Sequence, residues 1–188
     1  TLSSDEFGGR KPMSEYEPMV MDYIVKSFEE SGLQPGAADG TWLQGVPLVS
    51  THTTIDGGVL TISGKKGKMN LKESDQVVVW TNRAVDKVNL KNLQYVFCGF
   101  GIDAPEYNWN DYDGIDVKGK VVVLIAGDPG FFDDNLFRGK NVTYYSRWSY
   151  KFEEARRRQA AGVLIIHNEP ASSYSWQVVQ SGGAGIKQ

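Results

Sequence analysis

The chain has 188 residues and a single cysteine, Cys98, so it cannot form an internal disulfide. It has only two histidines, His52 and His167. A catalytic zinc ion needs three protein ligands, commonly with histidines at a short spacing. No HxxxH spacing occurs here, and the two histidines lie far apart in the chain, so we expect no metal ligand in this chain. His167 closes an apolar run, where a structural role at a strand end is favoured.

Other patterns that mark enzymes or nucleic-acid binders are also missing. The chain has no GxSxG nucleophile turn and no GxxxxGK[ST] phosphate loop, so we expect no catalytic residue. Its net charge is −3, and its basic run, Arg156 to Arg158, is short, which argues against nucleic acid as a partner. No apolar run approaches the ~20 residues of a membrane span, so no span is expected.

Two continuous apolar runs are the clearest structural signal. They lie in GKVVVLIAGDPG, residues 119–130, and in AAGVLIIHNEP, residues 160–170. Runs of this length, closed by turn residues, are typical of strands that are buried on both faces. The stretch between them has a helical pattern, which predicts a βαβ unit with adjacent parallel strands at residues 119–127 and 162–167. We expect the helix to begin near Tyr145 and to bury Tyr145, Trp148, Phe152 and Ala155.

Weaker signals precede this unit. Residues 15–32 predict a helix, with Pro18 in its first turn, an apolar repeat of Val20, Ile24 and Phe28, and a terminating Gly32. Residues 41–49 predict a short edge strand, because Pro47 interrupts them. Residues 58–81 predict a small β-ribbon. In LQYVFCGFGI, the two glycines beside Phe100 indicate a bulge or a close approach of the backbone.

The loop at residues 130–147 is long for a connection inside a compact domain, and such loops are often functional. It follows a parallel strand at the end where α/β folds gather binding groups. Arg147 could pair with a carboxylate of a peptide, and Tyr144 could offer a hydroxyl group and an apolar face. We therefore predict substrate contacts at Tyr144, Tyr145 and Arg147. In the competing interpretation, the aromatic residues cover the sheet edge and Arg147 pairs with Asp133 or Asp134.

Six stretches in this order resemble one protein family. They are LSSDEFGGRKP, MDYIVKSFEESGLQPG, GTWLQGVPLV, GFGIDAPEYNWNDYDGIDVKGKVVVLIAGDPG, VTYYSRWSYKFEEARRRQAAGVLIIHNEPASSYSW and QVVQSG. Together they are similar to zinc aminopeptidases that carry an inserted protease-associated (PA) domain, a plan shared with the transferrin-receptor ectodomain and glutamate carboxypeptidase. Each stretch has low specificity, and their joint order carries the resemblance.

The resemblance implies an α/β chain with two parts. Residues 1–49 would be the amino-terminal helix and strand of a peptidase domain. Residues 50–188 would be a PA domain, a β-sandwich or barrel-like fold with the βαβ unit, cut short at its carboxyl end. The family's zinc ligands would follow the insert, so the chain would hold no cofactor and would be inactive alone.

The function implied is that of a non-catalytic portion of a secreted or periplasmic zinc aminopeptidase. The PA domain would shape the access of peptide or protein substrates to the parent enzyme. Two alternatives stay open at this point. One is a binding-only, receptor-like PA module, and the other is the PA insert of a subtilisin-like serine protease. The amino-terminal segment DEFGGRKP, followed by a helix, favours the zinc family over the serine protease.

Overall fold

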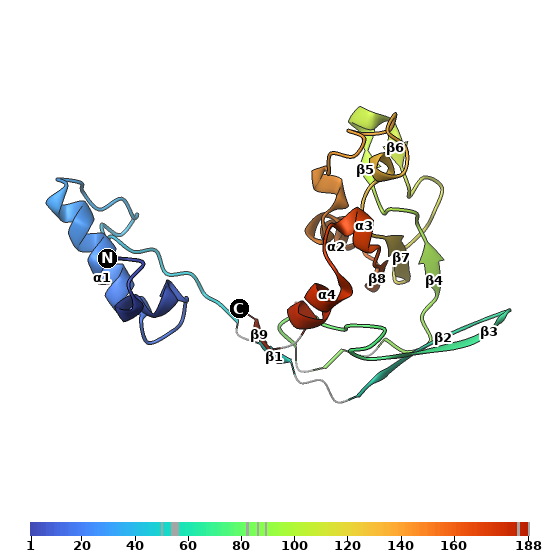
Figure 1. Ribbon diagram of the computed structural model, residues 1–188, viewed down its shortest axis with the longest axis horizontal. Coiled ribbons are helices and arrows are strands. Elements are labelled where there is room, and N and C mark those ends of the chain that lie inside the picture. The colour runs from blue at the N-terminus through green and yellow to red at the C-terminus, as the bar shows by residue number, and fades with distance from the viewer. Residues whose placement is uncertain are drawn as a thin grey trace. The chain divides into compact units, whose positions relative to one another are not determined.

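The structure is a computed structural model that describes residues 1–49, 51–53, 57–81, 83–85, 87–88, 90–183 and 185–187. The chain divides into two compact units, Thr1–Leu48 and Val49–Gln188 (Figure 1). Each unit has its own internal contacts.

The first unit contains a 3-10 helix, η1 (Asp5–Arg10), and one α-helix, α1 (Glu17–Glu30). The predicted helix is confirmed, with Pro18 in its first turn. Its end is a Schellman motif: Leu33 N donates to Phe28 O over 3.1 Å, and Gly32 has a positive φ of 77°. None of its residues is buried, and Phe28 is 45% exposed, so the apolar stripe has little cover within this unit.

The predicted edge strand at residues 41–49 is wrong, because these residues form no strand. A strand is stabilised by hydrogen bonds to a neighbour, and the first unit contains no other strand to supply them. Trp42 instead packs against Phe28, with ring centroids 6.1 Å apart, and donates from Nε1 to Glu29 over 3.1 Å.

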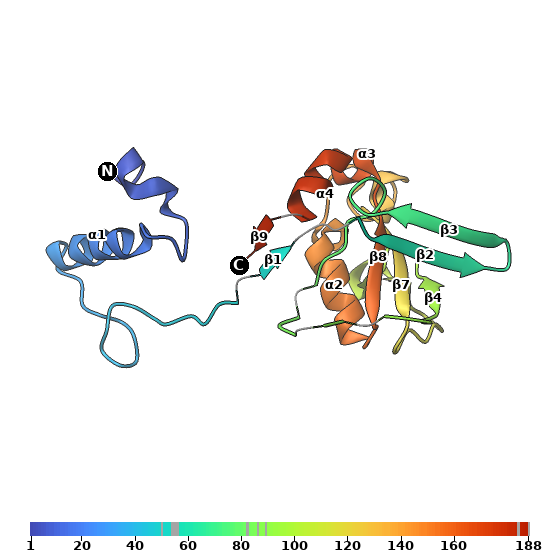
Figure 2. The same cartoon turned by 90° about the horizontal axis from the view of Figure 1, so that it is seen from below.

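A three-stranded parallel sheet forms the centre of the second unit. Its strand order is β4 (Tyr95–Phe97), β7 (Val121–Ile125) and β8 (Gly162–Ile166). The predicted βαβ unit is confirmed: β7 and β8 pair in parallel from Val121↔Gly162 to Ile125↔Ile166. Helix α2 (Trp148–Arg157) connects them (Figure 2). Val122 and Leu124 are completely buried, as expected for a central strand.

The predicted buried face of α2 is wrong in part. The helix begins at Trp148, after a 3-10 turn, η4 (Tyr144–Ser146), and it buries Tyr150, Lys151, Glu154 and Ala155. Trp148 and Phe152 are half-buried on its flank, where their rings lie 6.0 and 5.9 Å from that of Trp80. Aromatic residues lie on two sides of this helix, so the apolar period alone did not show which side faces the sheet.

The remaining strands form small two-stranded sheets. An antiparallel hairpin joins β2 (Val59–Gly64) and β3 (Gly67–Lys72). The short strands β5 (Asp103–Ala104) and β6 (Trp109–Asn110) pair around η2 (Pro105–Tyr107). β1 (Thr51–Thr53) pairs with β9 (Gly185–Lys187). The helices η3 (Pro129–Phe131), α3 (Glu169–Ser172) and α4 (Trp176–Gly183) complete the unit.

The β-ribbon predicted at residues 58–81 is present as the β2–β3 hairpin. Residues 78–80 form no strand. Within the described residues, the sheets have two or three strands each and do not close into a sandwich or barrel. The second unit is therefore a mixed α/β structure, and its assignment as a PA-type domain stays a prediction.

Candidate functional site

The candidate site lies at one edge of the parallel sheet. The carboxyl ends of β4, β7 and β8 meet at this edge because the three strands are parallel. Segments 98–102, 126–147 and 167–176 leave the sheet there, and this is the edge where α/β folds commonly bind ligands. The loop predicted at residues 130–147 belongs to it.

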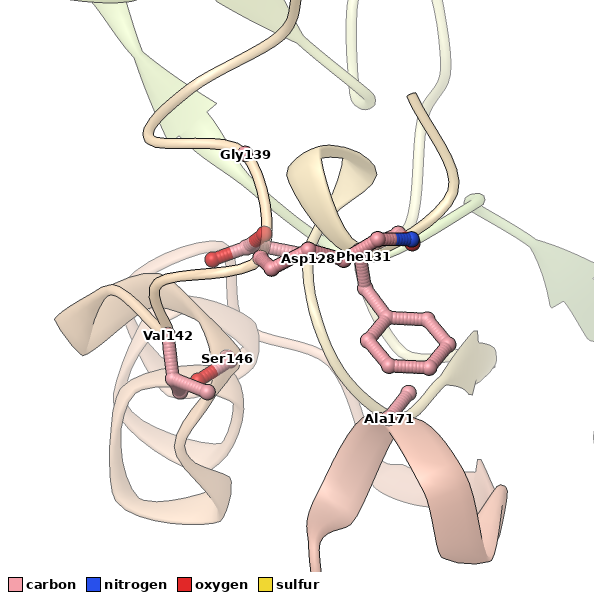
Figure 3. A pocket seen from close by; sticks show the side chains of 7 residues that line it. Asp128, Phe131, Gly139, Val142, Ser146 and Ala171 are labelled. Carbon is pink, nitrogen blue, oxygen red and sulfur yellow. The ribbon is translucent and has the colours of Figure 1, made fainter. Parts of the chain in front are cut away.

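Asp128 holds the two ends of this loop together. Its carboxylate is 2% exposed and accepts hydrogen bonds from Gly130 N over 3.1 Å, from Thr143 N over 3.2 Å and from the Thr143 hydroxyl group. Figure 3 shows Asp128 beside a cavity that Phe131 and Ala171 also line. The cavity volume is about 10 Å³, enough for roughly one water molecule and too small for an organic ligand.

Lys151 links the segments that follow β4 and β7 from inside the protein. Its side chain is completely buried, and its Nζ donates to Phe100 O over 2.5 Å and to Gly127 O over 2.9 Å. Burial lowers the pKa of Lys151 to about 8, although the charges of Asp111 and Asp128 act in the opposite direction. The ends of β4 and β7 are thus fixed to α2 by one buried amine.

The expected close approach of the backbone near Phe100 is confirmed. Asp111 Oδ2 accepts from Phe100 N over 3.1 Å and from Ile102 N over 3.0 Å. Gly99 and Gly101 both have positive φ, and a Cβ on Gly99 would lie 2.6 Å from the Asp111 carboxylate. Only glycine fits such a position without strain.

The side chain of Tyr145 packs among the aromatic rings that support the loop. Its hydroxyl group donates to Glu106, and its ring lies 4.8 Å from that of Tyr150 and 5.9 Å from that of Phe137. The hydrogen bond to Glu106, with a smaller contribution from burial, raises the pKa of Tyr145 well above its usual range. Its ring therefore supports the loop, and its hydroxyl group is already engaged.

Tyr144 and Arg147 face solvent. Tyr144 is 54% exposed, and its hydroxyl group donates to Glu153 over 3.3 Å. Arg147 is also exposed, and its guanidinium group makes no ion pair with any residue that the structure describes. The alternative in which Arg147 pairs with Asp133 or Asp134 is not seen: Asp134 lies 3.8 Å from Lys140.

Sequence reasoning missed three charged residues at this edge: Asp128 and Lys151, which are buried, and Asp111, which is half-buried. Asp128 had a local signal, because Asp-Pro-Gly favours a turn in which the aspartate side chain accepts from the backbone. Lys151 had none, because a lysine in a helical stretch is typical of a solvated face. Its partners are carbonyl groups about 25 and 50 residues away in the chain, which only the tertiary fold brings together.

The described residues do not fit a zinc site. Among them, no three His, Cys, Asp or Glu side chains are grouped as metal ligands would be. His167 is half-buried at the end of β8, with Nε2 3.2 Å from Tyr174 O and Nδ1 3.5 Å from the Ser172 hydroxyl group. His52 lies in β1, and its side chain is outside the described residues.

Comparisons with protein-family models, with curated proteins and with solved structures found no match to this chain. Among the described residues, no helix is long and apolar enough to cross a membrane.

Proposed function

We propose that this chain is a non-catalytic, peptide-contacting portion of a zinc-dependent aminopeptidase, in which a PA-type domain shapes substrate access. The support for a peptidase parent is the sequence resemblance. The support for a contact surface is Arg147, whose exposed guanidinium group has no charged partner among the described residues. The loop at residues 130–147 would present it to peptides beside Tyr144.

The loop is suited to this role because its scaffold is fixed and its outer side chains are available. Asp128 accepts hydrogen bonds from both ends of the loop, and Lys151 links Gly127, just before the loop, to the segment after β4. A preorganised loop loses less conformational entropy when it binds a ligand. A guanidinium group can bind a carboxylate through two parallel hydrogen bonds, which suits a peptide carboxyl terminus or an acidic side chain.

The two predicted tyrosines would act differently. Tyr144 would offer its half-exposed ring to a peptide side chain, while its hydroxyl group stays on Glu153. Tyr145 would hold the loop in shape through Glu106 and its neighbouring rings. We therefore expect Arg147 to contribute more of the binding free energy than either tyrosine, because hydrogen bonds to a charged group are stronger.

The test measures the hydrolysis of aminoacyl-anilides and peptides by two proteins. One is the protein that the gene encodes, and the other is the 188-residue chain. We expect the gene product to hydrolyse them, a chelator to abolish the activity, zinc to restore it, and the chain to be inactive. Turnover by the chain itself would refute the non-catalytic role. Inhibition of the gene product by a serine-directed reagent would support the subtilisin-like alternative, and peptide binding without turnover would support the receptor-like one.

The contact surface has its own test in the same gene product. We expect Arg147→Ala to lower kcat/KM several-fold for peptides with a free carboxyl terminus and to leave amidated peptides unaffected. Arg156→Ala is the matched control, because Arg156 is an exposed arginine in α2, outside the loop. If Arg147→Ala and Arg156→Ala behave alike on both substrates, the loop has no role in recognising substrate.

A further inference from the structure

The β2–β3 hairpin carries the strongest local positive charge in the chain. Its 14 residues from Val59 to Lys72 include Lys65, Lys66, Lys68 and Lys72 and no acidic residue. The whole chain has a net charge of −3, so the remainder carries −7. All four lysines are exposed, and none makes an ion pair with a described residue.

The hairpin extends away from the three-stranded sheet in both views (Figures 1 and 2). Its base is held by hydrogen bonds from α4: Trp176 Nε1 donates to Asp75 O over 2.9 Å, and Gln180 Nε2 donates to Ser74 O over 2.6 Å. An isolated two-stranded hairpin is marginally stable in water, so this anchoring matters. The result is a fixed arm with two outer edges.

The outer edge of β3 has free backbone groups. The two-residue turn makes Gly64↔Gly67 the closing pair, so alternate residues of β3, Lys68, Asn70 and Lys72, direct N–H and C=O away from β2. Lys72 agrees with this, because its N–H donates to the Gln76 side chain over 3.1 Å. The backbone groups of Lys68 and Asn70 are left without a partner among the described residues.

The side chains along this edge have two distinct faces. Successive residues of a strand point to opposite sides, so Lys68 and Lys72 share one face, and Met69 and Leu71 share the other. Met69 is 56% exposed. Lysine on an edge strand opposes pairing with basic or identical strands. The same lysines would favour a partner whose carboxylates lie opposite them, because cross-strand pairs of opposite charge are stabilising.

We propose that the outer edge of β3 binds an extended polypeptide strand in which carboxylate side chains alternate with apolar ones. The backbone of that strand would pair with Lys68 and Asn70. Its carboxylates would face the lysines, and its apolar residues would extend the face formed by Met69 and Leu71. This is the strand-addition mode of peptide recognition, in which main-chain bonds give affinity and alternate side chains give specificity. The site is separate from the loop at residues 130–147 and does not depend on its role.

The test is a titration of the 188-residue chain with capped peptides of about eight residues, within the usual length of a strand. One peptide alternates aspartate with valine, a second carries lysine in place of aspartate, and a third has the acidic composition with two central prolines. Amide resonances of β3 report the position of binding. We expect saturable shifts at Lys68 and Asn70 with the first peptide, and binding at least about tenfold weaker with the third, because proline cannot supply the paired N–H groups.

Charge reversal separates recognition from a general attraction. We expect Lys68→Glu to weaken binding of the acidic strand by about fivefold and to improve binding of the lysine-bearing strand. Lys118→Glu is the matched control, because Lys118 is an exposed lysine outside the hairpin and the change in net charge is the same. Equal binding of the proline-containing peptide, equal effects of the two variants, or shifts that avoid β3 would each overturn the proposal.

Discussion

Lys151 offers the sharpest test of the structure. Its amine is completely buried, so its pKa differs between the folded and unfolded states, and the free energy of unfolding must depend on pH. The substitution Lys151→Met keeps an unbranched side chain that reaches the ε position and removes the Nζ. It leaves Phe100 O and Gly127 O without their donor, and a buried carbonyl group that loses its donor costs about 1–3 kcal/mol. Relief from burying the charged amine offsets part of this cost. We expect a net loss of roughly 1–3 kcal/mol near neutral pH.

The pH dependence has a definite sign. Burial lowers the pKa of Lys151 to about 8, whereas an unfolded lysine titrates near ~10.4. Between these values the unfolded chain binds more protons than the folded protein, so the free energy of unfolding rises with pH. This contribution of Lys151 to the free energy of unfolding is fully present above the unfolded pKa and is lost as the pH falls through about 8. From about pH 7.5 to about pH 9.5 it amounts to about 2 kcal/mol, with incomplete titration allowed for.

The assay is urea unfolding followed by tryptophan fluorescence, since four of the five tryptophans lie in the second unit. The stability of the wild-type chain should rise over this pH range by about 2 kcal/mol relative to Lys151→Met. Lys118→Met, which removes an exposed lysine, should follow the wild type. The range ends below pH 10 because the pKa of Tyr112, raised by burial, makes tyrosine ionisation oppose folding at higher pH.

One result would refute this reasoning directly. If the profiles of the wild type and Lys151→Met stay parallel within about 0.5 kcal/mol, Lys151 titrates alike in the folded and unfolded states. The amine would then be hydrated in the folded protein, and the hydrogen bonds to the two strand ends would not hold.

Three further predictions concern the same unit. Asp128→Ala should lower the free energy of unfolding by about 2–4 kcal/mol, because three donors at Gly130 and Thr143 lose their acceptor; a change in urea midpoint no larger than that of an exposed aspartate variant would contradict this. Phe152→Ala should cost about 1–2 kcal/mol, less than a core phenylalanine, because the ring is half-buried; a loss above about 3 kcal/mol would show that it belongs to the core. Arg147→Ala should change the melting temperature by less than about 2 °C. Arg158→Ala should lower it clearly, because Arg158 bonds Glu154 and Asp103 and lies over the Tyr112 ring. Equal melting temperatures of the two variants would contradict this.

The sequence determined the parts of the fold that depend on local chemistry. The runs at residues 121–125 and 162–166 could be predicted as adjacent parallel strands from their apolar, β-branched composition. The prediction that both are buried on both faces holds for β7 and is wrong for β8, which lies at the edge of the sheet and whose residues are half-buried or exposed. Helix α1 could be predicted because Pro18 and Gly32 mark its ends through backbone geometry alone. The position of the candidate loop followed from the order of strand and helix, since the carboxyl end of a parallel strand must lead into the crossover connection.

Tertiary structure decided the features that depend on partners distant in the chain. Residues 41–49 contain strand-forming residues, but the first unit, all of which is described, holds no strand for them to pair with, and they form none. The buried face of α2 depends on where the sheet lies. The sheet packs against the side of the helix that carries Lys151, so Lys151 is buried and Trp148 and Phe152 lie on the flank. The charge state of Lys151 depends on distant groups in the same way, and so does the lack of an ion pair at Arg147 among the described residues. Each depends on the distances to groups that the sequence separates and only the folded chain brings near.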